Sequence, residues 1–366
     1  MGMPEIYIDF NEKKENFIYR LGRGIVAYVH VDSGASAAEY YTLSLKTEVE
    51  SALSKSSATG KDDIVAICKK MFDYGASKII LCIASTADSV QTHLETQKFN
   101  YLAVNAVTAA MVEWAEGINF RAGRKFMIIS DGTNCTTTTE ENKRYLVSVY
   151  PESTSVDVGT PADVAAVIAG SGDRSATYQV LGYNVNINSE KLSNYPGSKS
   201  KTANDKIDTG FLTLVNDGEK IKIGRAVNTL YHADAEGQSK DTTKATLAKV
   251  RGVDICNMIE DDIRDTFDNQ YVGQVLNSYK NKMAFISFIN TVYLAGLEGD
   301  ALEETGVNQV DIDVEAHYKL AQESGEDVSN MTEMQLRQYN TGSHLYLTGS
   351  LSIVDTMEDL RISFSL

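Results

Sequence analysis

The chain has 366 residues, 43% of them hydrophobic, and carries a formal net charge of −16. Its Lys and Arg residues are not clustered, which argues against nucleic acid as a partner, because neutralising phosphates requires such clusters. No apolar run approaches the roughly 18 residues that cross a bilayer. The first residues also lack the basic and apolar regions of a signal peptide. We therefore expect synthesis in the cytoplasm without secretory export or membrane insertion, and a chain long enough for two domains.

Cysteine and histidine, which often bind metals, are scattered along the chain. No CxxC pair occurs, and no His lies at ligand spacing from a Cys. We therefore predict buried free thiols, no metal site and no cofactor. The cysteines are Cys68, Cys82, Cys135 and Cys256.

From residue 24 onward, strands that are apolar throughout alternate with amphipathic helices. The helix predicted over Asp62–Tyr74, for example, has one apolar stripe, formed by Ile64, Ile67, Cys68 and Met71. Such an alternation indicates parallel strands with helices on both faces. It predicts a doubly wound, mostly parallel α/β sheet domain over residues 24–235. The predicted strands are Ile25–Val31, Lys78–Ile83, Tyr101–Val104, Lys125–Ser130 and Tyr145–Val149, and the other predicted helices are Asp88–Gln97, Ala106–Ile118 and Ala162–Ala169.

Polar stretches punctuate the middle of the chain. Ser189–Lys206 is polar and contains a proline, which predicts an exposed loop. Phe211–Val215 and Lys220–Val227 flank an Asp-Gly dipeptide at residue 217, which predicts a β-hairpin. Asp234–Thr242 is polar and flexible in composition, and we place the domain boundary there.

A second domain of the α+β class is predicted over residues 236–340. One helix carries apolar residues at i, i+4 spacing from Ile255 to Phe267, and Lys282–Leu297 predicts another apolar helix. Between Glu298 and Glu333, eleven acidic residues occur against a single Lys. This acidic segment is either a solvated face or a docking face for a basic partner.

Both ends of the chain have the period-2 pattern of half-buried strands. In His344–Ile353 the apolar side chains fall mostly on odd positions, and after the polar interruption Asp355–Asp359 the phase changes. Terminal strands of this kind need a sheet, either in the same molecule or at the sheet edge of a neighbour. Their apolar residues are Ile6, Ile8 and Phe10 at one end and Leu360, Ile362, Phe364 and Leu366 at the other.

An α/β sheet keeps an enzyme as an alternative, because ligands often bind at the carboxyl ends of its strands. Asp131 follows a predicted strand directly, although no second acid or metal set accompanies it. Gly170–Gly172 is a candidate anion-binding loop, but it follows a helix instead of opening one. No Walker A motif, dinucleotide fingerprint or nucleophile elbow is present.

A series of short motifs is distributed over the last two-thirds of the chain in a characteristic order and spacing. They are Ser175–Leu181, Gly210–Leu214, Asp217–Ile223, Arg225–Leu230, Asp261–Phe267, Tyr271–Gly273, Asn340–Ser343 and Val354–Leu360. In this region the chain resembles the tail sheath proteins of contractile phages and of phage-tail-like bacteriocins. The opening, Pro4–Ile8 with Arg23–Ala27, also resembles the compact sheaths of Gram-positive prophages.

The resemblance implies a non-enzymatic structural subunit that stacks as rings in a helical sleeve around a rigid tube. Contraction of such a sleeve drives the tube through a target envelope. The N-terminal arm, residues 1–23, and the C-terminal strands, residues 341–366, are implied to add strands to sheets of neighbouring subunits. An infectious phage and a headless bacteriocin particle both remain open as the source.

The expected partners are further copies of the chain, the tail tube protein, and baseplate and tail terminator proteins. After synthesis in the bacterial cytoplasm, the chain is expected in an assembled virion tail or tail-like particle. In this family the region of the acidic segment faces the tube. The tube-facing candidates are therefore Glu303, Glu304, Asp311, Asp313, Glu315 and Lys319.

Overall fold

The computed structural model of the protein describes residues 23–121, 124–131, 142–150, 159–172, 174–177, 180–183, 201–216, 219–231 and 246–364. Several predictions fall outside these residues and are not tested by the structure. They are the N-terminal arm residues Ile6, Ile8 and Phe10, the terminal Leu366, Cys135, the Asp-Gly turn at residue 217, and the domain boundary at Asp234–Thr242.

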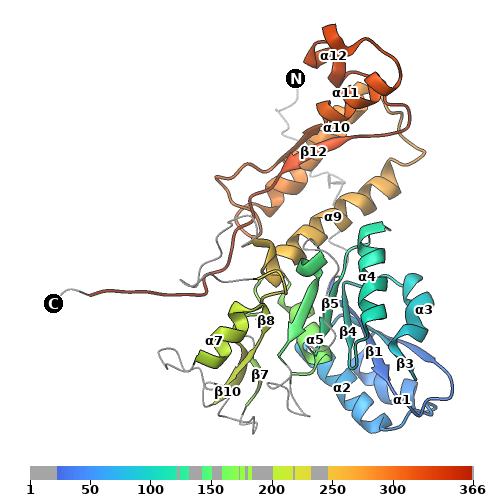
Figure 1. The fold of residues 1–366 in the computed structure, drawn as a ribbon, viewed down its shortest axis with the longest axis vertical. Coiled ribbons are helices and arrows are strands. Elements are labelled where there is room, and N and C mark those ends of the chain that lie inside the picture. Colours follow the sequence, from blue (N-terminus) through green and yellow to red (C-terminus); the bar gives the residue numbers. More distant parts are fainter. Residues whose placement is uncertain are drawn as a thin grey trace, which may run out of the picture.

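A seven-stranded sheet lies at the centre of the larger domain, with the strand order β2-β3-β1-β4-β5-β6-β8 (Figure 1). Every neighbouring pair is parallel except β2 and β3, which are antiparallel. The predicted α/β class with a mostly parallel sheet is thus confirmed. The strands are β1 Ile25–Val31, β2 Glu39–Leu43, β3 Lys78–Ala84, β4 Tyr101–Val104, β5 Met127–Ser130, β6 Leu146–Val149 and β8 Phe211–Leu212.

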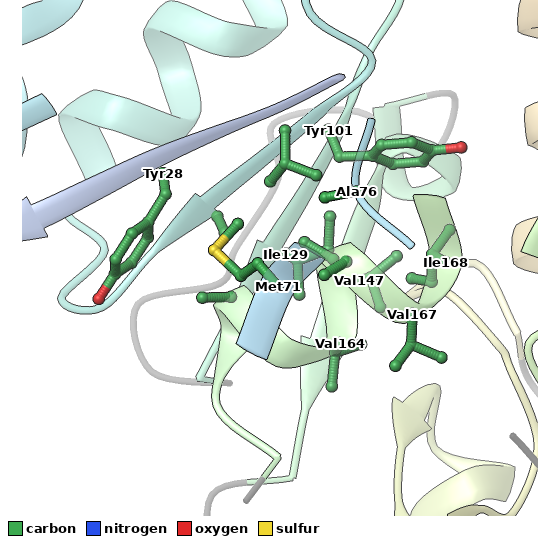
Figure 2. Packing of buried hydrophobic residues seen from close by; sticks show 14 of the residues in the cluster. Tyr28, Met71, Ala76, Tyr101, Ile129, Val147, Val164, Val167 and Ile168 are labelled. Carbon is green, nitrogen blue, oxygen red and sulfur yellow. The ribbon is translucent and has the colours of Figure 1, made fainter. Parts of the chain in front are cut away.

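Helices cover both faces of this sheet because successive strand residues point to opposite sides. In β1, Val26 and Tyr28 contribute to one buried layer, whereas Ala27 and Val29 contribute to the other. Figure 2 shows the first layer, in which side chains of the sheet pack against α2 and α5. The helices of the first layer are α1 Val49–Leu53, α2 Lys61–Tyr74 and α5 Pro161–Ser171, and those of the second are α3 Gln91–Glu95 and α4 Ala109–Arg121.

A small antiparallel sheet, of order β7-β10-β9, lies beside the large one. β9, Leu214–Asn216, pairs with β10, Lys220–Ile223, so these strands form the predicted hairpin. The single strand predicted over residues 211–215 is wrong, because β8 pairs with β6 in the large sheet and only β9 enters the small one. Buried Thr213 lies between the two short strands. The third strand is β7, Val180–Tyr183.

The predicted loop over residues 189–206 is wrong in its last part, where α7 spans Lys201–Asp208. The sequence of α7 is mostly polar. Ile207 near its end packs beside the buried residues Val227 and Tyr231. Ile207 is the one apolar residue among those of α7 whose side chains the structure describes, and one apolar residue is too weak a pattern to predict a helix.

The C-terminal domain is built around the long helix α9, Val250–Gln270, which extends from the α/β domain along the second domain (Figure 1). Ile255 and Ile259 of α9 pack against Phe285 and Ile289. The helix predicted over residues 282–297 corresponds to α10 Tyr279–Phe288 followed by a π-helical turn and a 3-10 turn. The remaining elements are β11 Gln309–Ile312, α11 Val314–Glu323, α12 Glu333–Arg337 and β12 Leu347–Ser350.

The strand predicted over residues 344–353 is shorter in the structure, where it forms β12 and pairs antiparallel with β11. Ile353 makes a separate bridge to Leu302. Among the residues placed by the structure, no helix is long and apolar enough to span a membrane.

Candidate assembly interface

Residues 360–364, called here the C-terminal arm, leave the body of the subunit as an extended segment (Figure 1). The three apolar side chains predicted to lie on one strand face are exposed, Leu360 by 86%, Ile362 by 60% and Phe364 by 84%. The arm pairs with no strand in the described part of the chain. Exposed apolar side chains on an extended segment without a strand partner are typical of a segment that binds another surface.

The segment before the arm, residues 354–359, is called the arm root and is held by the C-terminal domain at its start. The Val354 amide donates a hydrogen bond to the Ala301 carbonyl at 3.1 Å. The Arg251 guanidinium donates to the Val354 carbonyl and, at 3.0 Å, to the Asp300 carbonyl. Arg251 lies in the first turn of α9, so the arm root begins against the start of that helix.

Two basic side chains then bind acidic residues of the arm root. They belong to Arg225, which follows β10, and to Lys249, which directly precedes α9. Lys249 Nζ lies 3.0 Å from Glu358 Oε2 and also contacts Asp355. Arg225 Nη2 lies 2.7 Å from Asp359 Oδ2. The Glu358 side chain is only 6% exposed, so its charge is the best shielded of the group. We call these five residues the clasp.

Burial and ion pairing shift the pKa values of the two basic residues of the clasp in opposite directions. Burial alone would lower the pKa of Lys249, but hydrogen bonds and charges from Asp355 and Glu358 outweigh it, and the pKa is raised. The pKa of Arg225 is raised in the same way, against its burial, by Asp359 and Glu358. Both side chains are therefore held in the charged form.

The two-stranded sheet of β11 and β12 has one closed and one open edge. The side chain of Asn290, from the π-helical turn Ile289–Leu294, accepts from the Val310 amide at 2.8 Å and donates to the Val310 carbonyl at 2.9 Å. This amide side chain therefore occupies the outer edge of β11. No described strand lies along the outer edge of β12.

The alternation of an antiparallel ladder then identifies the free backbone groups of β12. Val310 is opposite Gly349, and its amide and carbonyl point away from β12. Residues directly opposite each other share the same orientation, so the backbone groups of Gly349 also point outward, as do those of Leu347 two residues away. The open edge of β12 thus presents donors and acceptors for an added strand.

The tube-facing candidates lie in the C-terminal domain, but they do not form one free acidic surface. Asp311 is paired with Arg337, whose hydrogen bond lowers the pKa of Asp311. Asp313 caps α11, accepting from the Ala316 amide at 2.8 Å. The three other acidic candidates are exposed, and they are Glu303, Glu304 and Glu315. Glu315 lies 2.6 Å from Lys319, and Glu303 accepts a hydrogen bond from the Thr305 hydroxyl at 3.3 Å.

The candidate enzyme residues are not brought together. Asp131 follows β5 and is half-buried, with an interaction of its own. Gly170 lies inside α5, where an added Cβ would come within 2.2 Å of the Tyr74 carbonyl oxygen, so this glycine permits close packing of α5 on the end of α2. Burial raises the pKa of the Cys68 thiol to about 12. No group of three potential metal-binding side chains occurs within the ranges that the structure describes.

No protein-family model matches the chain. A search of curated proteins finds the tail sheath protein of Clostridium phage phiCD119, which is 25% identical over 99% of this chain and 98% of the relative. The match covers nearly the full length of both proteins. The chain is a homologue of tail sheath proteins.

Solved structures of two sheath tail proteins and of a baseplate assembly contain chains with the same fold. The sheath tail protein of Desulfitobacterium hafniense matches with a TM-score of 0.55 and 14% identity over 84% of this homologue and 94% of that chain. The sheath tail protein of Listeria innocua matches with a TM-score of 0.54 and 12% identity over 81% and 90%. A chain in the anti-feeding prophage baseplate in its contracted state matches with a TM-score of 0.58 and 12% identity over 100% and 99%.

Two features of this sheath homologue were missed by sequence reasoning. The sequence indicates only a polar interruption between strands at Asp355–Asp359, and nothing in it identifies Arg225 and Lys249 as partners. Asn290 lies in a largely apolar helical stretch, where a polar residue is compatible with a surface position. Its pairing with β11 depends on the π-helical turn, for which the sequence gives no clear signal.

Proposed function

We propose that this protein is a non-enzymatic structural subunit of a contractile tail sheath, which polymerises as a helical sleeve around a tail tube. The observation that supports this most is the apolar C-terminal arm, which has no strand partner in the described part of its own chain, in a homologue matched to a phage tail sheath protein over nearly its full length. Contraction would drive the tube through a target envelope. Such a subunit would be made in a bacterial cytoplasm and incorporated into a virion tail or tail-like particle.

We further propose that the C-terminal arm of one subunit pairs with the open edge of β12 in a neighbour. Because Asn290 occupies the outer edge of β11, β12 is the edge of this sheet that is able to accept a strand. Each added hydrogen bond contributes about 1 kcal/mol net, and burial of Leu360, Ile362 and Phe364 adds to this. A head-to-tail exchange of this kind generates a ring if the rotation between neighbours closes, and an open helical polymer if it does not.

Electron microscopy of the purified full-length protein tests the proposed function. We expect rings or tubes, because the arm supplies a contact that repeats from subunit to subunit. Monodisperse monomers at high protein concentration would contradict the proposal. Baseplate, tail terminator and tube proteins are proposed as the other partners, and their presence is not needed for this test.

The exposed acidic residues of the C-terminal domain are proposed to contact the tail tube. Glu303 and Glu304 suit this role better than Asp311 or Asp313, whose carboxylates hold their own domain together. Exposed charge pairs contribute little individually, which fits a surface that has to release the tube on contraction.

Replacing both Glu303 and Glu304 with Gln is expected to weaken binding of the tail tube protein about fivefold at low salt, from two exposed charge contacts. Folding is expected to be unchanged, since both side chains are exposed. Co-sedimentation with assembled tubes measures the effect. The matched control is Glu113→Gln, an exposed acid on α4 of the other domain, and equal binding by both variants would remove these residues from the tube interface.

A further inference from the structure

Residues near both ends of the described chain contact α9 or the residue directly before it. Arg23 Nη2, just after residues 1–22, lies 2.6 Å from Asp254 Oδ1, and Arg23 Nη1 lies 3.4 Å from Asp261. The buried Tyr101 hydroxyl of β4 donates to the same Asp254 at 2.9 Å. The arm root reaches the same helix at Lys249, the residue directly before α9. One helix therefore connects the central sheet with both chain ends.

The arm root also crosses from one domain to the other. β12 and the Val354–Ala301 hydrogen bond belong to the C-terminal domain, whereas Arg225 follows β10 in the α/β domain. Ser175 Oγ, also in the α/β domain, donates to Glu358 Oε1 at 3.0 Å. The last fixed point of the arm is thus on the α/β domain, although the chain arrives there from the other domain.

We propose that Arg225 and Lys249 are positioning residues for assembly, which fix the direction and reach of the C-terminal arm by holding Glu358 and Asp359. This inference rests on the proposed sheath function. Because of the clasp, the arm moves with the α/β domain and the start of α9. A change in the relative orientation of the two domains would therefore also move the neighbour that binds the arm.

Chain geometry shows how much the clasp restricts the arm. With the clasp closed, the five residues 360–364 reach about 16 Å from their anchor. With the clasp open, ten residues from 355 onward reach about 33 Å. Doubling the reach increases the volume that the arm can occupy about eightfold. The effective concentration of the arm at its acceptor strand falls by a similar factor.

The test compares three variants with the wild-type full-length chain. Arg225→Gln with Lys249→Gln removes both charges, Arg225→Lys with Lys249→Arg keeps them, and Lys46→Gln removes a control ion pair, in which Lys46 lies 2.6 Å from Asp73 in the α/β domain. The critical concentration for tube formation is measured by sedimentation. We expect an increase of about eightfold for the double Gln variant, from the accessible volume above, and less than about twofold for the other two.

A second measurement follows the arm in the soluble subunit. Trypsin cleaves after Arg361, and it needs an extended segment on both sides of that bond, including Asp359. Mass spectrometry of the released peptide Ile362–Leu366 therefore reports how often the clasp opens. Release is expected to be about tenfold faster in the double Gln variant, and to accelerate with NaCl in the wild type but not in that variant.

The two measurements separate the possible outcomes. Equal release from wild type and the double Gln variant would overturn the clasp. Faster release with an unchanged critical concentration would overturn its role in assembly, and a matching loss of thermal stability would show a general role in folding. If the wild-type chain forms no tubes, the proposed function fails, and the release measurement alone decides whether the clasp exists.

Discussion

Replacing Leu360, Ile362 and Phe364 together with Ser is expected to abolish tube formation and to leave the subunit folded. These side chains are largely exposed in the single subunit, so their removal costs the monomer little. In a polymer, burying each of them contributes about 1.5 to 3 kcal/mol. A total near 5 kcal/mol corresponds to more than a thousandfold in affinity. Electron microscopy and analytical ultracentrifugation measure the result.

The opposite face of the arm provides the matched control. Arg361→Gln with Ser363→Ala changes as much of the arm but keeps its three apolar residues, and this variant is expected to form tubes. Truncation after Asp359 is expected to behave like the triple Ser variant. Tubes of normal length from the triple variant would show that the apolar face of the arm is not the assembly contact.

Replacing Gly170 with Ala is expected to destabilise the α/β domain by about 1 to 3 kcal/mol, the usual cost of overpacking. The new Cβ would lie 2.2 Å from the Tyr74 carbonyl oxygen and 2.9 Å from the Gly75 Cα, both of them backbone atoms. Relief requires α5 and α2 to move apart, which opens the core layer between them and the sheet. Thermal and urea unfolding measure the loss.

Gly117→Ala is the control for this prediction. Gly117 also lies inside a helix, α4, but an added Cβ there has no atom within 4 Å. Helix propensity predicts a neutral or slightly stabilising effect of up to about 1 kcal/mol. If both variants have the same stability, the contact between α5 and α2 is able to adjust, and close packing does not explain Gly170.

The regular part of the fold was predictable because burial on both faces leaves a strong pattern. The strands at Ile25–Val31 and Tyr101–Val104 have the bounds predicted for them, and α2 differs from its prediction by one residue. The spacing of apolar residues in a strand or helix indicates which of its faces is buried against the rest of the protein. The mostly parallel sheet follows from the same pattern.

The elements that the sequence does not predict depend on tertiary contacts, which leave no local sequence pattern. β2, Glu39–Leu43, is an edge strand with one largely exposed face, and its sequence is mostly polar and aromatic. Residues 211–216 divide between two sheets at Thr213 because each half finds a different partner. Such choices are made by tertiary structure, which overrides a short strand signal.

The candidate interface was predictable in its apolar residues but not in its attachment. Period-2 alternation identified Leu360, Ile362 and Phe364, which are exposed in the structure. The clasp joins residues more than a hundred positions apart, including Arg225 and Asp359, so no spacing in the sequence could indicate it. The same holds for Asn290, whose role depends on the position of β11.

A helical reconstruction of the assembled protein by cryo-electron microscopy tests the exchange of strands most directly. We predict that residues 360–364 of each subunit lie along the outer edge of β12 in a neighbour, hydrogen-bonded to the backbone of Leu347 and Gly349. The side chain of Asn290 should remain paired with Val310. An arm that folds back on its own subunit, or one that pairs along β11 after displacing Asn290, would contradict this account.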